Sequence, residues 1–379
     1  MIRDQEMMQA LVTQIRAFVR DVAIPNEDRV EAEDGIPDDV VAKLRELGSF
    51  GWSIPEEYGG LGLTSEELAM AFIEFTQCSV AFRVYGGQNA GIGSECIIRD
   101  GTDEQKQRYL PPLATGEMIG CLALTEVTAG SDATALKTRA EKIDGGYRIN
   151  GNKRYITLAP IADLYTVFAR TSGERGAKGV TAFLIERGTE GMTPGDSTPK
   201  MGQEGAPIGE ITFDNVVVPD EAVLGGVEGM GFHTVMKALN KQRINLSALA
   251  VGPAIRMLND AIAFAKQRRQ FDKAIGEFQL VQAMLAECKV EIEAARALIL
   301  ETARKRDRDE DVTLDVSLCK YFSTEMCGRV ADRVVQIFGG EGYVKGTGIE
   351  RFYRDVRAFR IYEGTSQIHL LNIAKNLLR

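Results

Sequence analysis

The hydrophobic pattern of this chain changes its period twice, and that change limits the folds open to the sequence. Near the start, apolar residues follow the spacing of one helix face: Leu11, Ile15, Phe18, Val19 and Val22. From about residue 118 to 230 the chain is rich in Gly, Thr and Val, with short apolar runs typical of strands. After residue 230 long helical stripes return. No alternation of helix and strand runs through the middle part, so a β-barrel or sandwich is predicted there.

We therefore predict an α+β multidomain protein with three parts: an all-α domain over residues 1–117, a β domain over 118–230 and a second helical domain over 231–379. A chain of 379 residues is too long for one ordinary core, which favours several domains or layers. In the β domain, Asn150-Gly151 has the sequence of a hairpin turn. At Thr102, a capping-type residue followed by two acids indicates the start of a helix.

Charge and cysteine usage narrow the class of protein. The formal net charge of −9 argues against a general nucleic-acid binder, which needs a basic face. No secretory signal is visible at the start, and no stretch approaches about 18 uninterrupted apolar residues, so no membrane insertion is expected. The cysteines form no C-x-x-C pair, and free thiols in a reducing cytoplasm are expected at Cys78, Cys96, Cys121, Cys288, Cys319 and Cys327.

Several enzyme classes are disfavoured. His233 and His369 are the only histidines, and neither is near a cysteine cluster, so no metal site is expected and each is interpreted as a structural or surface residue. No G-x-S-x-G sequence is present, which argues against a Ser-His-Asp hydrolase. The glycine-rich run at 225–231 does not follow a strand in an α/β unit. It favours a loop between domains over a dinucleotide-binding fingerprint.

Five stretches, taken together, resemble the acyl-CoA dehydrogenases in order and across nearly the whole chain. They are L-A-L-T-E-V-T-A-G-S-D (122–132), I-N-G-N-K-R-Y-I-T (149–157), Q-R-R-Q-F…F-Q (267–279), Q-I-F-G-G-E-G-Y (336–343) and I-Y-E-G-T-S-Q (361–367). The resemblance implies an FAD enzyme of fatty acid or amino acid catabolism, with a four-helix-bundle-like C-terminal domain. It also implies a homotetramer or dimer, an acyl-CoA substrate and an electron-transfer flavoprotein as electron acceptor.

The resemblance further implies which residues bind FAD. On the flavin side these are Leu122, Leu124, Thr125, Ser131, Tyr155 and Thr157, joined by Thr365 and Gln367, with either Thr365 or Ser366 capping the last helix. On an FAD held mainly by a neighbouring subunit they are Arg268, Gln270, Phe271, Phe278, Gln279, Gln336, Gly339 and Gly340. An arginine fork suits a diphosphate, and an aromatic face suits a flavin ring. Taken alone, Tyr155 would be interpreted as a strand aromatic and Q-R-R-Q as a charged helix end. Many members of the family differ at three positions, with Pro at Val127, Trp at Tyr155 and Asn at Leu158.

Glu363 is the candidate base. An acyl thioester has a weakly acidic α-carbon, so removing its proton needs a positioned base. Glu363 follows Ile361 and Tyr362, and an apolar, water-poor setting raises the pKa of a carboxylate. The family places its base at this residue in most members, and in others at the position of Gln242, which cannot act as a base. The resemblance also implies substrate contacts at Ser131, Asn240, Gln242, Arg243, Tyr362 and Gly364.

Arg83 lies in C-S-V-A-F-R-V-Y-G-G-Q-N-A-G (78–91), a segment that by resemblance lines the acyl site. An arginine among small and apolar residues is unexpected, because a buried unpaired charge is costly. One interpretation is that Arg83 pairs with an anion at the far end of a short acyl chain. Glutaryl-CoA dehydrogenases have such an arginine near this point, as do related desulfinases that lack the base carboxylate. The other interpretation is that Arg83 pairs with an internal Glu or reaches solvent.

The expected reaction is the α,β-dehydrogenation of a short acyl-CoA to the 2-enoyl-CoA. Glu363 removes the α-proton, and N5 of FAD accepts the β-hydride. Three alternatives stay open on the sequence. They are oxidative decarboxylation of the glutaryl-CoA type, oxidation of the acyl-CoA by O₂, and a flavin-binding protein without catalysis.

Overall fold

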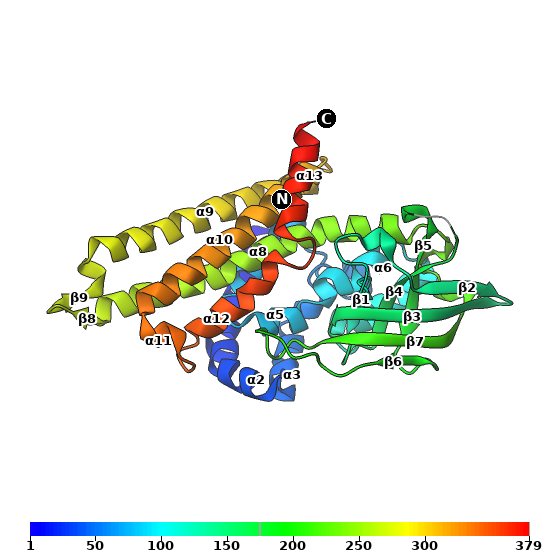
Figure 1. Ribbon diagram of the computed structural model, residues 1–379, viewed down its shortest axis with the longest axis horizontal. Helices are drawn as coiled ribbons and strands as arrows, with labels where there is room; N and C mark the ends of the chain where they lie inside the picture. Colours follow the sequence, from blue (N-terminus) through cyan, green and yellow to red (C-terminus); the bar gives the residue numbers. More distant parts are fainter. Residues whose placement is uncertain (174–175, 379) are drawn as a thin grey trace.

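The computed structural model describes residues 1–173 and 176–378, and it confirms the predicted order of helical, β and helical parts (Figure 1). The helices of the N-terminal part are α1 (Gln5–Phe18), α2 (Glu27–Glu33), α3 (Asp38–Glu46), α4 (Ser65–Phe75), α5 (Val80–Gly86), α6 (Ser94–Asp100) and α7 (Asp103–Thr115). The predicted helix start at Thr102 is confirmed. The Thr102 hydroxyl accepts from Gln105 N at 3.2 Å, and the Gln105 amide oxygen accepts from Thr102 N at 3.1 Å.

The middle part is one hydrogen-bonded sheet. Its strands are β1 (Gly120–Ala123), β2 (Arg139–Ile143), β3 (Gly146–Thr157), β4 (Leu164–Arg170), β5 (Val180–Glu186), β6 (Met192–Pro194) and β7 (Ile208–Pro219). The order across the sheet is β1-β4-β2-β3-β7-β6, with β5 also paired to β4. Successive residues of β4 enter two different cores. Tyr165 and Val167 pack within the β domain, whereas Leu164 and Phe168 pack against helices α6, α7 and α8.

The predicted hairpin turn at Asn150-Gly151 is wrong, because these residues lie inside β3. The chain turns six residues earlier in the sequence, at Asp144 and Gly145, between β2 and β3. The register of β3 against β7 shifts between Ile149 and Gly151, which marks a β-bulge. Gly151 has φ 148°, and a Cβ there would lie 2.6 Å from Thr138 Oγ1. The glycine therefore allows a close approach of two strands rather than a turn.

The C-terminal part is built around one long helix. Its elements are α8 (Gly231–Gln267), β8 (Arg269–Gln270), β9 (Lys273–Ala274), α9 (Gln279–Asp307), α10 (Thr313–Phe338), α11 (Gly340–Tyr343), α12 (Ile349–Val356) and α13 (Ser366–Leu377). Helices α8, α9 and α10 pack along one another, and α13 packs on α10. By length and composition, α8 is apolar enough to cross a membrane. However, 61% of its apolar window is buried inside the protein, as in the core helix of a globular domain.

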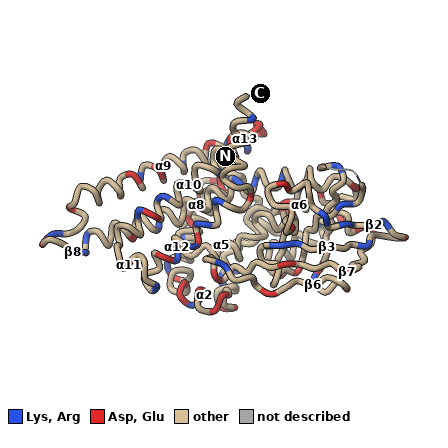
Figure 2. The backbone as a smooth tube through the Cα atoms, in the orientation of Figure 1, with Lys and Arg blue, Asp and Glu red and all other residues tan. Residues whose placement is uncertain are grey.

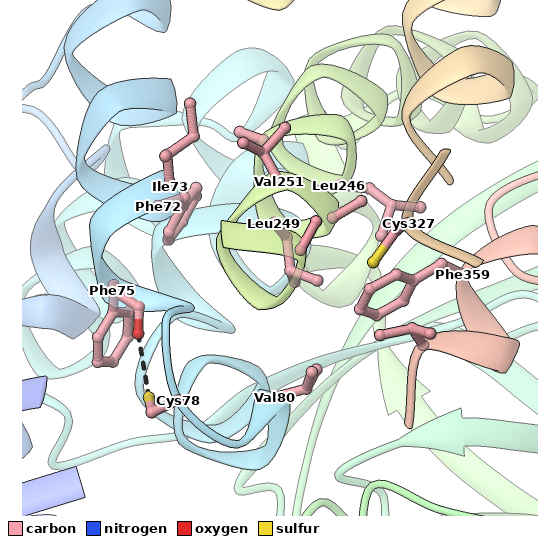
Figure 3. Packing of buried hydrophobic residues seen from close by; sticks show 14 of the residues in the cluster. Phe72, Ile73, Phe75, Cys78, Val80, Leu246, Leu249, Val251, Cys327 and Phe359 are labelled. Carbon is pink, nitrogen blue, oxygen red and sulfur yellow. Dashed lines mark hydrogen bonds between the residues drawn. The ribbon is translucent and has the colours of Figure 1, made fainter. Parts of the chain in front are cut away.

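One hydrophobic core joins the two helical parts. Figure 3 shows Phe72 of α4, Leu249 of α8, Cys327 of α10 and Phe359 from the turn after α12 in the same group. The N-terminal and C-terminal helices are therefore packed as one unit around α8, which fixes α5 relative to the segment that follows α12. All six cysteines are free and buried, in agreement with the expected free thiols.

Ion pairs fasten α12 to α2. Arg351 Nη1 lies 2.8 Å from Asp28 Oδ1 and 3.0 Å from Glu31 Oε2, and Arg351 Nη2 lies 3.2 Å from Glu27 Oε2. Figure 2 shows the acidic residues of α2 beside α12. Arg351 and Glu27 are both buried, so removing one partner would leave an uncompensated charge. The segment that leads into residues 357–365 is thus anchored on the N-terminal domain.

Candidate active site

Glu363 lies on a sharp backbone turn between a 3₁₀ turn at Arg357–Arg360 and α13. Both Glu363 (φ 56°) and Gly364 (φ 97°) have positive φ angles. The left-handed region is unfavourable for a residue with a Cβ, so the surroundings must hold this conformation. Thr365 caps α13, since its hydroxyl accepts from Ile368 N at 3.3 Å, and this settles the cap between Thr365 and Ser366.

The Glu363 carboxylate has a buried oxygen and a pKa near neutrality. Glu363 is partly exposed as a residue, but its Oε2 is buried and has no hydrogen-bond partner. Burial raises the pKa of Glu363 to about 7, against the opposing effects of Arg83, Gln242, Lys320 and Arg243. A carboxylate with such a pKa is a stronger base than an exposed one, yet it is still ionised in part at pH 7.

Arg83 of α5 is buried, with 4% of its surface exposed. Its Nε and Nη2 have no hydrogen-bond partner, and no carboxylate within the described part of the chain forms an ion pair with it. Its guanidinium carbon lies 4.4 Å from the centre of the Phe72 ring. Burial lowers the pKa of Arg83, and the nearby Glu363 and Tyr362 oppose this effect. Arg83 therefore neither pairs with an internal Glu nor reaches solvent.

Gln242 and Gly91 lie beside Arg83. The Gln242 Oε1 accepts from Asn245 Nδ2 at 3.3 Å, and the Gln242 amide lowers the pKa of the nearby Glu363. A Cβ on Gly91 would lie 2.6 Å from Gln242 Oε1 and 3.5 Å from Arg83 Nη2. Gly91 thus leaves open the space between these two side chains. Sequence reasoning missed Gly91, because the signal is a tertiary contact with α8.

Arg243 contacts the backbone of the candidate base. Its Nε donates to the Glu363 carbonyl at 3.2 Å, and its Nη1 donates to Asn240 Oδ1 at 3.1 Å. Two further side chains reach the same turn. The Lys320 Nζ donates to the Gly364 carbonyl at 2.6 Å, and the His369 Nε2 donates to the Glu363 carbonyl at 3.3 Å. Lys320 carries no local signal in the sequence, and His369 was expected to be a structural or surface residue.

Several residues expected to face the flavin lie along β1 and β3. Tyr155 has φ 57° and an exposed ring, with the Arg154 guanidinium 4.8 Å from the ring centre. Behind it, the buried Lys153 Nζ lies 2.8 Å from Glu126 Oε1 and 3.1 Å from the Leu124 carbonyl. This buried pair fastens the 122–126 segment to β3. The expected contacts Leu122, Thr125 and Thr157 are partly exposed, Leu124 is buried and Ser131 is exposed.

The other expected FAD contacts lie at the far end of the C-terminal helices, around β8, β9 and α11 (Figure 1). Arg268 Nη1 lies 3.4 Å from Glu341 Oε1, which brings the 268–279 segment next to Gly339 and Gly340. A Cβ on either glycine would meet no atom within 4 Å. Most of this group is exposed, including Gln270, Phe271, Gln279 and Gln336, whereas Phe278 is partly buried. One chain therefore does not bring the two groups of expected FAD contacts together.

Three domain families match the chain in sequence order. They are the acyl-CoA dehydrogenase N-terminal domain at residues 4–117, its middle domain at 121–216 and its C-terminal domain at 229–378. The chain belongs to the acyl-CoA dehydrogenase family. Members of the same family include a 3-(aryl)acrylate reductase of Clostridium sporogenes, 39% identical over 370 residues, covering 96% of this chain and 98% of the relative. An acyl-CoA dehydrogenase of Bacillus subtilis is 38% identical over 376 residues, covering 99% and 98%.

Solved structures of acyl-CoA dehydrogenases share the fold. Butyryl-CoA dehydrogenase of Megasphaera elsdenii superposes with a TM-score of 0.95 at 34% identity, covering 100% of both chains. A glutaryl-CoA dehydrogenase in complex with glutaryl-CoA has a TM-score of 0.94 at 34% identity, covering 100% of this chain and 96% of that one. The subunit CarC of a caffeyl-CoA reductase–Etf complex of Acetobacterium woodii is 36% identical over 370 residues, covering 96% and 97%.

This acyl-CoA dehydrogenase is an oxidoreductase that uses FAD, and its residues fit that cofactor. The exposed Tyr155 ring offers a flat aromatic face to a planar ligand. The open space at Gly339 and Gly340 lets a ligand approach the backbone closely, and the exposed Arg268 beside them can bind a diphosphate.

Proposed function

We propose that the protein oxidises a short acyl-CoA thioester to the 2-enoyl-CoA, with Glu363 as the base. The substrate loses a proton from the α-carbon to the Glu363 carboxylate, and a hydride from the β-carbon leaves with the two electrons. FAD supplies the acceptor for that hydride. The backbone N–H of Glu363 helps to hold the thioester carbonyl, which acidifies the α-carbon. The buried, partner-free Oε2 of Glu363 is the observation that supports this role.

The base is tested by Glu363→Gln, which keeps the size of the side chain and removes its basicity. We expect FAD to stay bound and exchange of the substrate α-proton with D₂O to fall by about a thousandfold. Glu325→Gln is the matched control, since Glu325 is an acid of α10 that bonds Ser366 at the start of α13. Exchange at the wild-type rate in Glu363→Gln would disprove the assignment.

The acyl group that we propose carries an anion at its far end. Arg83 Nε and Nη2 are buried donors without partners, and a carboxylate would satisfy both in the bidentate manner of arginine. The similarity to the glutaryl-CoA complex supports this class of substrate. A panel of butyryl-, isobutyryl-, octanoyl-, glutaryl- and succinyl-CoA tests it, with CO₂ release measured for glutaryl-CoA. If neutral substrates give the highest kcat/KM and Arg83→Met leaves the order unchanged, the anion proposal fails.

A second candidate is the reverse reaction, the reduction of an enoyl thioester. The names of two relatives, an arylacrylate reductase and a caffeyl-CoA reductase subunit, favour it. In that direction Glu363 would give its proton to the α-carbon, which needs the same position and a pKa near neutrality. Rates with 2-enoyl-CoA and a reduced artificial donor, compared with rates of acyl-CoA oxidation, decide which direction dominates.

We further propose a cytoplasmic homotetramer or dimer that passes electrons to an electron-transfer flavoprotein. The separation of the two groups of FAD contacts within one chain supports FAD sites shared between subunits. The relative that forms part of an Etf complex supports the electron acceptor, and the six free cysteines support the compartment. Particle mass in solution tests the assembly. Comparing peroxide formation with reduction of the flavoprotein separates a dehydrogenase from an oxidase.

A further inference from the structure

Three side chains from three helices hold the two carbonyl groups of the turn that carries Glu363. The Glu363 carbonyl accepts from Arg243 Nε of α8 and from His369 Nε2 of α13. The Gly364 carbonyl accepts from Lys320 Nζ of α10, at the shortest of the three distances, 2.6 Å. A turn with two successive positive φ angles is therefore fixed from outside the segment itself.

Lys320 is an unexpected residue at its position. Its side chain is fully buried, and no acid within the described residues forms an ion pair with it. Among the described residues, the Lys320 ammonium group hydrogen-bonds only the Gly364 carbonyl. Burying a lysine without a counter-ion lowers stability, and an apolar residue such as Met would fill the same space without that cost. The residue type therefore calls for a reason other than packing.

The turn itself supplies such a reason. Left-handed backbone at a glutamate costs about 1–2 kcal/mol, so a free turn would relax and redirect the carboxylate. The Gly364 carbonyl directly follows the two left-handed residues, and Lys320 Nζ of α10 bonds it. Gly364 also packs closely on His369, since a Cβ on Gly364 would lie 2.9 Å from His369 Nε2.

We propose that Lys320 is a positioning residue, which holds the Gly364 carbonyl so that the Glu363 carboxylate keeps its direction and its anionic form. This inference rests on the proposed role of Glu363 as the base. The positive charge of Lys320 lowers the pKa of Glu363, with a smaller effect than that of Arg83. Five charged or titratable groups face Glu363. They are Arg83 on α5, Arg243 on α8, Lys320 on α10, His369 on α13, and Tyr362, which directly precedes Glu363 in the sequence.

Burial lowers the pKa of His369 to about 4, so this ring is neutral in the pH range of an assay. It can then donate through Nε2 without adding a charge to the site. Among the groups that hold the two carbonyls, the charge comes only from Lys320 and Arg243. Arg243 also bonds Asn240, whereas the Nζ of Lys320 serves the turn alone.

The test compares Lys320→Met, Lys320→Gln and Lys320→Arg in the FAD-loaded enzyme, with the exposed Lys375→Met of α13 as control. For Lys320→Met we expect kcat to fall about tenfold or more, while KM and FAD content change less than about threefold. The acid limb of the kcat–pH profile should move up by roughly half a unit, because the carboxylate loses a stabilising charge. Lys320→Arg should restore kcat in part and return the limb.

Lys320→Gln separates the hydrogen bond from the charge, and it keeps the test open if Lys320→Met does not fold. It should retain more kcat than Lys320→Met and show the same shifted limb. A purely structural role would lower the melting temperature of these variants and leave kcat and the limb at wild-type values, which would overturn the inference. If Glu363→Gln is inactive while the Lys320 variants keep the wild-type kcat and acid limb, the role of Lys320 is disproved and the proposed base stands. If Glu363→Gln stays active, the proposed role of Glu363 as the base is disproved.

Discussion

Arg83 and Glu363 carry opposite charges at one site, and each keeps a buried polar atom without a hydrogen-bond partner. These atoms are Nε and Nη2 of Arg83 and Oε2 of Glu363. The charge of Arg83 is the largest influence that lowers the pKa of Glu363 against burial. Two opposite charges that are buried without a hydrogen bond between them raise the free energy of the folded state. A ligand that reaches both can recover that free energy on binding.

Replacing Glu363 by Gln should stabilise the fold, and more so at high pH. Because burial raises its pKa to about 7, the contribution of Glu363 to stability is complete below about pH 4.5 and is lost as pH rises through 7. Gln does not ionise, so the gain in unfolding free energy over wild type should grow by about 2 kcal/mol between pH 5 and pH 8. Urea unfolding at both pH values measures it. The exposed Glu190→Gln should show no such growth, and a constant difference for Glu363→Gln would contradict the raised pKa.

Gly91→Ala should damage the substrate site with little effect on the fold. The new Cβ would lie 2.6 Å from Gln242 Oε1, so the Gln242 side chain must shift. We expect kcat/KM to fall by about tenfold, with most of the effect on substrate affinity. Gly173→Ala is the control, since a Cβ there meets no atom within 4 Å. Unchanged kinetics in Gly91→Ala would show that the space between Gln242 and Arg83 is not used.

Lys153→Met should lower both stability and FAD content. It leaves Glu126 buried without its cation, at a cost of about 3 kcal/mol, and it frees the Leu124 carbonyl of the flavin-side segment. Urea unfolding and flavin absorbance after gel filtration measure the two effects. Lys142→Met, which breaks an exposed pair with Asp220, should have little effect on stability and keep FAD. A full complement of FAD in Lys153→Met would argue against a role for the buried pair.

Ligand-induced stabilisation should reveal the anion preference without turnover. A ligand that binds only the folded protein raises its stability in proportion to the logarithm of concentration over Kd. At equal concentration, glutaryl-CoA should therefore raise the melting temperature of Glu363→Gln more than butyryl-CoA does. The difference should vanish when Arg83→Met is added. A larger shift with butyryl-CoA would point to an acyl site without an anion partner.

The sequence predicted the succession of domains because apolar period is a local property, repeated along every helix and strand. The helix start at Thr102 was predictable for the same reason, since its capping partner Gln105 is three residues away. Asn150-Gly151 misled because two strands approach closely there, and only the fold shows that Thr138 occupies the space beside Gly151. Glu363 could be chosen as the candidate base from the sequence, because the apolar Ile361 and Tyr362 directly precede it and the motif around it resembles the family's.

The positions of Lys320 and Gly91 in the site could not be predicted from the sequence. Lys320 stands 44 positions before Gly364, inside an apolar helix stripe where nothing marks it as different. Gly91 acts on Gln242, which belongs to a different domain. Both contacts arise from the packing of α5, α8 and α10 on one core, and no local pattern encodes which residues that packing brings together.

The left-handed backbone at Glu363 also bears on how this protein can change by mutation. Glycine adopts φ 56° without strain, whereas glutamate does so at a cost of about 1 kcal/mol or more. Random substitution by glycine at this codon would relieve the strain and remove the base in one step. At position 363, the substitution that relieves backbone strain is therefore one that removes the proposed base. A relative without a glutamate at this position must either carry its base elsewhere, as at the position of Gln242, or have given up proton abstraction.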